Sequence, residues 1–156
     1  MTDQAPVKVP SGNLSPAEGG AWGGFLRAHA AVVRKLDAEL RKAHGLPLSS
    51  YEVLLHLRWA PEHRMRMGEL AESVLLTLSG VTRLVSRLER EGLVRREPYP
   101  EDRRGAYAIL TGAGIDRLGE ADPTHLAGVH KLFLEHFSEE ELKTMAEYWR
   151  RVLRGA

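Results

Sequence analysis

One stretch of this sequence, residues 77–111, constrains the fold most strongly, because it combines a helical pattern with a hairpin pattern. Its first half begins at Thr77, a residue type that caps helices, and stops at Gly92, a residue type that ends them. Between them, four apolar residues are spaced as on one helical face: Val81, Leu84, Val85 and Leu88. Two short apolar runs follow, at 93–97 and 106–110, around a Pro-containing turn. The sequence therefore predicts a helix followed directly by a β-hairpin.

Helices are also predicted on both sides of this stretch. A serine followed three residues later by a glutamate is a capping box, and such boxes mark helix starts at Ser15, Ser49 and Ser138. Gly45 and Pro47 should end the first helix, because glycine suits the C-terminal cap and proline cannot continue a helix.

The remaining elements follow from shorter patterns. A short strand at 64–66 should lead into a helix over about 67–75, which pairs with the helix after Thr77 as a helix-turn-helix. A further helix is expected from Thr111 to about Phe137, and Pro123 inside it should kink or break it.

This order of elements predicts a mainly α fold with a small β-hairpin wing, a winged helix-turn-helix with flanking N- and C-terminal helices. The flanking helices carry more apolar surface than so small a central unit can bury, so a second copy of the chain is the simplest partner. The expected organisation is a disordered tail at 1–14, an N-terminal dimerisation helix at 15–46, a DNA-binding unit at 47–111 and C-terminal dimerisation helices at 112–156.

Composition narrows the class of protein. The formal net charge of the 156 residues is only +1, so a DNA-binding surface would have to arise from local segregation of charge. Cysteine is absent, which excludes disulfides and cysteine-bound zinc. No apolar run approaches the roughly 20 residues that span a bilayer, and the N-terminal stretch lacks the apolar core of a signal peptide. We therefore expect a cytoplasmic protein without a membrane segment.

The helix after Thr77 has an outer face that suits DNA. Small and hydroxylated residues in its first turns permit close approach to base edges, and arginines further along can donate two hydrogen bonds to guanine. The candidate contacts are Thr77, Ser79, Gly80, Thr82, Arg83 and Arg87. An ordinary amphipathic helix with a solvated polar face would show the same pattern, and this helix alone does not decide between the two.

The hairpin favours DNA, because Arg103 and Arg104 stand at its tip beside the candidate recognition helix. Wing arginines can enter the minor groove, whose narrow A·T-rich segments attract them. Arg104 is the preferred groove contact and Arg103 the backbone contact. Asp102 would repel phosphate, so we expect it to brace the tip by pairing with an arginine or by capping the turn.

The run LTLSGVTRLVSRLEREGLVRR, followed by EDRRGAYAILTGAG, resembles the winged helix-turn-helix of the MarR family of bacterial transcriptional regulators. The Asp-x-Arg at 102–104 matches the wing signature of that family, and Leu88, Gly92 and Leu93 match the end of its recognition helix. The resemblance extends over about residues 20–154. Leu78 departs from it, because relatives often carry a polar or basic residue there, and no base contact is assigned to Leu78.

This resemblance implies a homodimer in which the first and the last two helices intertwine. Each subunit would place its recognition helix in a major groove of double-stranded DNA, one DNA turn, ~34 Å, apart on a pseudo-palindromic operator. Members of the family often release DNA on binding a small aromatic or phenolic anion between the dimer helices and the DNA-binding unit. The resemblance thus implies a ligand-responsive regulator, most simply a repressor.

Aromatic and basic residues on the first two helices are candidates for such a ligand site, because an arginine or histidine among aromatic rings suits a carboxylate or phenolate. The candidates are Trp22, Phe25, Arg27, His29, Tyr51, His56 and Trp59. Packing in the core is the alternative role for the aromatic members.

Metal sites and catalysis find no support in the sequence. His125, His130 and His136 are spaced so that they do not share one helical face. Motifs for nucleophilic serine, phosphate or dinucleotide binding are missing. We therefore expect no metal, no cofactor and no enzymatic activity. The alternative to DNA binding is a helical protein-interaction module whose winged unit binds a protein.

Overall fold

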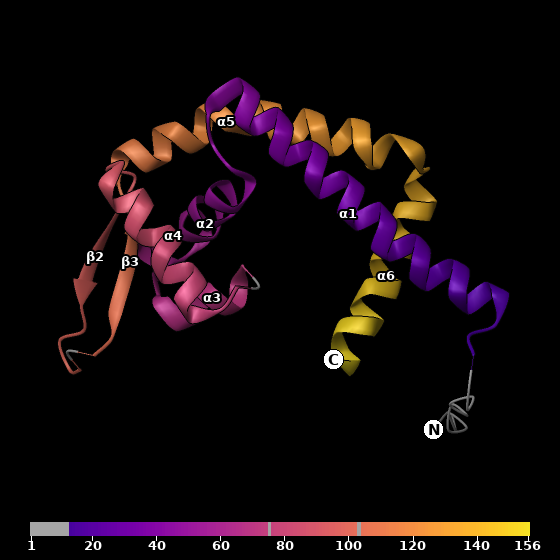
Figure 1. Ribbon diagram of the computed structural model, residues 1–156, viewed down its shortest axis with the longest axis horizontal. Coiled ribbons are helices and arrows are strands. Elements are labelled where there is room, and N and C mark those ends of the chain that lie inside the picture. The colour runs from indigo at the N-terminus through magenta and orange to yellow at the C-terminus, as the bar shows by residue number, and fades with distance from the viewer. Residues whose placement is uncertain (1–12, 75, 103) are drawn as a thin grey trace.

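The computed structural model describes residues 13–74, 76–102 and 104–156. Within these ranges the chain forms six α-helices, three β-strands and two 3₁₀ turns (Figure 1). In chain order they are α1 (Pro16–His44), α2 (Leu48–Trp59), η1 (Pro61–His63), β1 (Arg64–Arg66), α3 (Met67–Ser73), α4 (Leu78–Arg90), β2 (Val94–Pro98), β3 (Ala106–Leu110), α5 (Gly112–Leu132), η2 (Leu134–His136) and α6 (Glu139–Gly155). Of the tail predicted at 1–14, residues 1–12 lie outside the described residues. The mainly α fold with a small antiparallel sheet is confirmed.

Two of the three predicted capping boxes are present. Ser15 and Ser138 each accept a hydrogen bond from the backbone N–H three residues on, and the glutamate there reaches back to the serine. The box predicted at Ser49 is wrong: the cap position of α2 is Pro47, two residues earlier, and the Leu48 N–H in the first turn donates to the Asp37 carboxylate of α1 at 2.9 Å. Because of this start, Ser50 points into the protein, where it is 1 % exposed.

The helix predicted around Pro123 is continuous, so of the kink or break expected there, the break does not occur. α5 keeps its helical assignment through the exposed proline and ends at Leu132, short of Phe137. Packing on both sides of the proline accounts for this. Ala121 is buried before it, and Gly128 after it lies so close to α1 that an added Cβ would come 2.6 Å from a methyl carbon of Leu36.

The wing is part of a three-stranded antiparallel sheet in the order β1-β3-β2. The predicted hairpin is confirmed, with Val94 paired to Leu110 and Pro98 to Ala106. The short strand predicted at 64–66 is also confirmed, and its three residues pair with 107–109 on the other edge of β3.

The hydrophobic core lies where the unit of α2, α3, α4 and the sheet meets the long helices. Residues of α2, α3, α4 and the sheet fill its centre, and α1 and α5 cover it with Leu36, Leu40, Leu118 and Ala121. Figure 1 shows α1 and α5 running alongside each other, with the α2–α4 unit and its sheet at one end and α6 beside the N-terminal half of α1 at the other. The α2–α4 unit and its sheet are therefore attached to a long helical arm.

That arm has an uncovered apolar face. None of the residues of α6, all of which the structure describes, is buried. Large apolar side chains of α1 and α6 remain exposed together: Trp22, Phe25, Tyr148, Trp149, Val152 and Leu153. The surplus apolar surface predicted from the sequence is present, and it is concentrated at this end of the molecule. Within the described ranges, no helix combines the length and apolar character needed to cross a membrane.

The start of α5 gives a test of the fold. An added Cβ on Gly114 would come 2.2 Å from the carbonyl oxygen of Leu93 and 2.6 Å from a methyl carbon of Leu110. Gly114→Ala should therefore destabilise the chain by about 2–3 kcal/mol, measured by chemical denaturation. Gly112→Ala is the matched control. Apart from its chain neighbours and the nearby backbone of α5, no described atom lies within 4 Å of a Cβ added there. Equal stability of the two variants would contradict this packing.

Candidate nucleic-acid interface

The first turn of α4 is held by its own cap. The Thr77 hydroxyl accepts a hydrogen bond from the Gly80 N–H at 3.1 Å and lies 3.2 Å from the Ser79 hydroxyl. The turn before it is joined to α3 by a bond from the Leu76 N–H to the Ala71 carbonyl at 3.0 Å. The cap predicted at Thr77 is confirmed, and it fixes the residue at which α4 begins.

The outer face of α4 combines free and engaged polar groups. Ser79 and Arg83 are exposed. The Thr82 hydroxyl donates to the Leu78 carbonyl at 2.7 Å, and the Ser86 hydroxyl donates to the Thr82 carbonyl at 2.8 Å, so both are turned onto the helix backbone. Among the described residues, Arg83 forms no ion pair. Its guanidinium is thus a free hydrogen-bond donor on this face.

Arg87 lies at the side of α4 rather than on its outer face. It is half-buried, and its guanidinium donates to the Ser50 hydroxyl of α2 at 2.7 Å. This bond joins the recognition helix to the core. The sequence did not reveal it, because Ser50 was placed inside a capping box.

The two arginines that lead into the wing are paired with acids. Arg96 donates to the Glu89 carboxylate through two guanidinium nitrogens, at 2.9 and 2.7 Å, and through its backbone N–H at 3.2 Å. These hydrogen bonds hold the pKa of Glu89 below its usual value. Arg95 pairs with Glu97 on the same strand. The Arg96–Glu89 pair therefore ties the wing to α4.

The wing tip is a tight turn held by Asp102. Its carboxylate accepts the Arg104 backbone N–H at 2.9 Å, and its carbonyl accepts the Gly105 N–H at 3.2 Å. This is the turn-capping arrangement, one of the two roles predicted for Asp102. A Cβ on Gly105 would come 1.9 Å from the Tyr99 ring, so the turn requires glycine there. Arg104 is exposed, and Arg103 lies outside the described residues.

A pair of tyrosines braces the base of the tip. The rings of Tyr99 and Tyr107 meet edge to face, with centroids 4.6 Å apart. Arg66 lies over the first ring at 5.0 Å from its centroid and Arg64 over the second at 4.9 Å. Such contacts stabilise a surface by about 0.5–1 kcal/mol each. Two tyrosines flanking a hairpin tip were the available sequence signal for this brace.

This arrangement can hold two kinds of DNA contact in fixed relation. α4 presents the unpaired Arg83 on an exposed face, and the wing presents Arg104 at a braced tip. The Arg96–Glu89 pair fixes the wing against the helix. Because the cap, the ion pair and the tyrosine brace order these elements in the free protein, little conformational entropy would be lost when they meet a rigid duplex.

A polar network joins α2 to α5. Tyr51 is 2 % exposed and donates its hydroxyl to Asp122 at 2.8 Å, and Arg58 pairs with the same carboxylate at 2.6 Å. Burial alone would raise the pKa of Asp122, but the bonds from Arg58 and Tyr51 lower it. The His125 ring stacks near Tyr51 at 4.3 Å, and burial lowers its pKa. Tyr51, a candidate ligand contact, thus belongs to the core.

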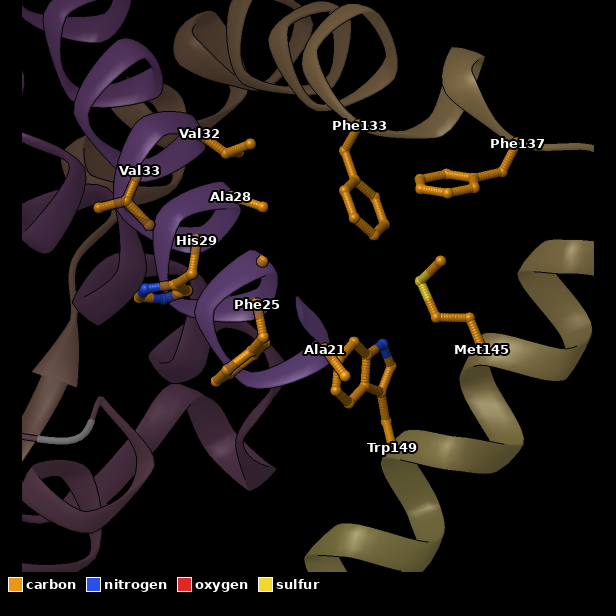
Figure 2. Close-up of a pocket in the computed structure, with 11 residues that line it drawn as sticks. Ala21, Phe25, Ala28, His29, Val32, Val33, Phe133, Phe137, Met145 and Trp149 are labelled. Carbon is orange, nitrogen blue, oxygen red and sulfur yellow. The ribbon is translucent and has the colours of Figure 1, made fainter. Parts of the chain in front are cut away.

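The other ligand candidates separate into two groups. Phe25 and His29 line a hollow of ≈ 450 Å³ between α1, the segment after α5, and α6 (Figure 2). Trp22 lies in the adjoining hollow between α1 and α6. Arg27 is exposed on α1, and His56 and Trp59 meet edge to face on α2, with Trp59 69 % exposed. These last three are not among the described residues that line the hollow, so the structure does not gather the seven candidates into one site.

The walls of the hollow are almost entirely apolar. Figure 2 shows Phe133, Phe137, Met145 and Trp149 facing the side chains of α1, with His29 as the titratable residue of the lining. The Trp149 ring lies 5.4 Å from that of Phe25. Met145 and Trp149 of α6 complete the hollow, and neither was assigned to a ligand site from the sequence.

Comparison with known proteins agrees with this geometry. The model of the MarR family matches residues 44–105, from the end of α1 to the turn before β3. The HTH-type transcriptional regulator MhqR of Bacillus subtilis is 29% identical over 126 residues, covering 81% of this chain and 84% of that protein. A regulator of Bacillus cereus is 34% identical over 119 residues, 76% of this chain and 77% of its own length.

Solved structures extend the similarity to nearly the whole chain. Sco3205, a MarR family transcriptional regulator from Streptomyces coelicolor solved in complex with DNA, superposes with a TM-score of 0.85 at 34% identity, covering 92% of this chain and 90% of that one. AbsC, another MarR family regulator from the same organism, gives 0.84 at 30% identity, covering 94% and 100%.

Proposed function

Because this chain belongs to the MarR family of transcriptional regulators, we propose that it binds a specific DNA sequence through α4 and the wing. The observation that carries the proposal is the unpaired, exposed Arg83 on α4 together with the exposed Arg104 of a wing that the Arg96–Glu89 pair joins to α4. A guanidinium in the major groove can donate two hydrogen bonds to guanine, and one in the minor groove answers the negative potential there.

The first test is a gel shift with the DNA upstream of the gene of this protein. We expect a discrete complex that survives a large excess of unrelated duplex. If an equal concentration of unrelated DNA removes the complex, binding is nonspecific. That result would favour the protein-interaction alternative.

We further propose that the protein acts as a homodimer. The exposed apolar face of α1 and α6 includes Trp22, Trp149 and Leu153, of which Leu153 is 75 % exposed. Apolar patches of this kind mark interaction surfaces, and a self-complementary patch generates a two-fold symmetric pair. A dimer would place two copies of α4 on successive turns of one DNA face, and its site would be a pseudo-palindrome.

Binding of the protein at such a site would block transcription, so the proposed role is repression. The repressor YetL of Bacillus subtilis, 33% identical over 97 residues, supports this role.

A small aromatic ligand is proposed to occupy the hollow between α1 and α6. Its ring would pack against Phe25 and Trp149, and an acidic substituent would lie beside His29. The hollow reaches the apolar face proposed for dimerisation, so occupation could alter the spacing of the two DNA-binding units and release the operator.

This ligand site can be tested by thermal shift with benzoate. His29→Leu should weaken benzoate binding about tenfold, because the substitution removes the polar partner and keeps an apolar wall. Arg27→Leu is the matched control, since Arg27 lies on α1 outside the lining. If no aromatic acid raises the melting temperature of the unaltered protein, the ligand proposal is wrong.

The wing contact can be tested through its salt dependence. Arg104→Ala should weaken binding to the operator and reduce the slope of log K against log salt by about one unit, because one positive charge is lost from the DNA interface. Lys143→Ala, which removes an exposed charge from α6, should leave the slope unchanged. An unchanged slope for Arg104→Ala would contradict a wing contact.

A further inference from the structure

Leu78 occupies an unusual place for a large apolar residue. It is the first residue of α4 and is 57 % exposed. Of the described residues of α4, which include every position of the helix, it is the sole large apolar side chain left exposed, since Val81, Leu84, Val85 and Leu88 are buried. A single exposed leucine is common in proteins and does not by itself indicate a function. The position of Leu78 at the leading end of α4 indicates one only when the neighbouring side chains are considered as well.

The neighbouring hydroxyls are largely engaged within the protein. Thr82, one helical turn after Leu78, donates to the Leu78 carbonyl at 2.7 Å. Ser86 donates to the Thr82 carbonyl at 2.8 Å, and the Thr77 hydroxyl accepts the Gly80 N–H. The N-terminal turns of α4 therefore offer hydrocarbon and few uncommitted donors, although this is the part of a recognition helix that approaches base edges.

Thymine presents a methyl group in the major groove, where the other bases present hydrogen-bonding groups alone. Building on the DNA-binding function proposed above, we infer that Leu78 recognises a thymine by van der Waals contact with its C5-methyl group. The contact removes both the methyl group and the leucine side chain from water, which is favourable. A base without the methyl group buries less apolar surface at this position.

The position of that thymine follows from helical geometry. Leu78 lies five residues before Arg83, which corresponds to about 7.5 Å along the helix axis. Successive bases are about 3.4 Å apart along one strand. The thymine read by Leu78 should thus lie within about two base pairs of the guanine read by Arg83 in each half-site.

Replacing thymine by uracil tests this inference, because the exchange removes the methyl group and keeps every hydrogen bond. The operator is first obtained by selection from random duplex DNA, and each thymine is then replaced singly by deoxyuridine. One position in each half-site should lose about three- to tenfold in affinity, the effect of one buried methyl group. At that position, Leu78→Ala should bind the thymine and uracil duplexes equally.

Leu76→Ala is the matched control, since Leu76 is an exposed leucine in the turn before α4 with no proposed base contact, and this variant should keep the thymine preference. The exposure of Leu78 means that its truncation removes no core contact, and circular dichroism checks that the variant is folded. The inference is overturned if no uracil substitution weakens binding, or if Leu78→Ala retains the preference. Failure of the selection to yield any specific sequence would instead overturn the DNA-binding proposal, and this inference with it.

Discussion

Arg83→Ala is expected to lower affinity for the operator by about 1–3 kcal/mol, a factor of roughly 5–150, and to relax the preference for one base pair in each half-site. The physical reason is that the Arg83 guanidinium is exposed on α4 and forms no ion pair among the described residues, so it is free to donate to guanine. Fluorescence anisotropy with the operator and with single-base variants measures both effects. Equal weakening on all sequences would mean that Arg83 contacts phosphate.

Arg87→Ala separates base contact from helix positioning on the same helix. Because Arg87 donates to Ser50, its loss leaves a buried hydroxyl without that partner and should lower stability by about 1 kcal/mol. A direct role in base recognition, proposed for Arg87 from the sequence, would additionally change base preference. Measuring stability and specificity for both variants distinguishes the two roles.

Leu153→Glu is expected to convert the proposed dimer into a monomer and to lower operator affinity by about 100-fold or more. The side chain is 75 % exposed in the single chain, so the substitution should spare the subunit fold while placing a charge in the apolar dimer face. The loss of affinity follows because two linked half-site contacts bind far more tightly than one. Sedimentation velocity measures the oligomeric state, and anisotropy measures the affinity.

Lys143→Glu is the matched control for that variant. It introduces the same residue on the polar side of α6, where Lys143 is exposed and pairs with Glu139. This variant should remain dimeric. A dimer formed by Leu153→Glu with unchanged affinity would place the dimer contact elsewhere on the chain.

Local sequence signals predicted those parts of the fold that local chemistry determines. The Thr77 cap, the apolar stripe of α4 and the strands around the wing turn each depend on residues close in the sequence, and all are present. The start predicted for α2 was wrong because a capping signal at Ser49 competes with core packing at Ser50. Packing places Ser50 in the core, and the capping signal is overridden.

The long-range contacts of the site could not be read from the sequence. The Arg87–Ser50 bond joins residues 37 positions apart, and the Tyr51–Asp122 bond joins residues 71 positions apart. Their residue types fit many other partners equally well. Such pairs determine which side chains are free to contact DNA. The sequence therefore offered six candidate contacts, at Thr77 and along α4, without ranking them. The structure distinguishes the free Arg83 from the engaged Arg87.

Selection from a pool of random duplex DNA by the purified protein tests the central claim most directly. The account predicts enrichment of a pseudo-palindrome whose half-sites are centred about 10 base pairs apart, since two copies of α4 would occupy successive major grooves on one face. Enrichment of no sequence, or of a single unrepeated half-site bound by one chain, would contradict it.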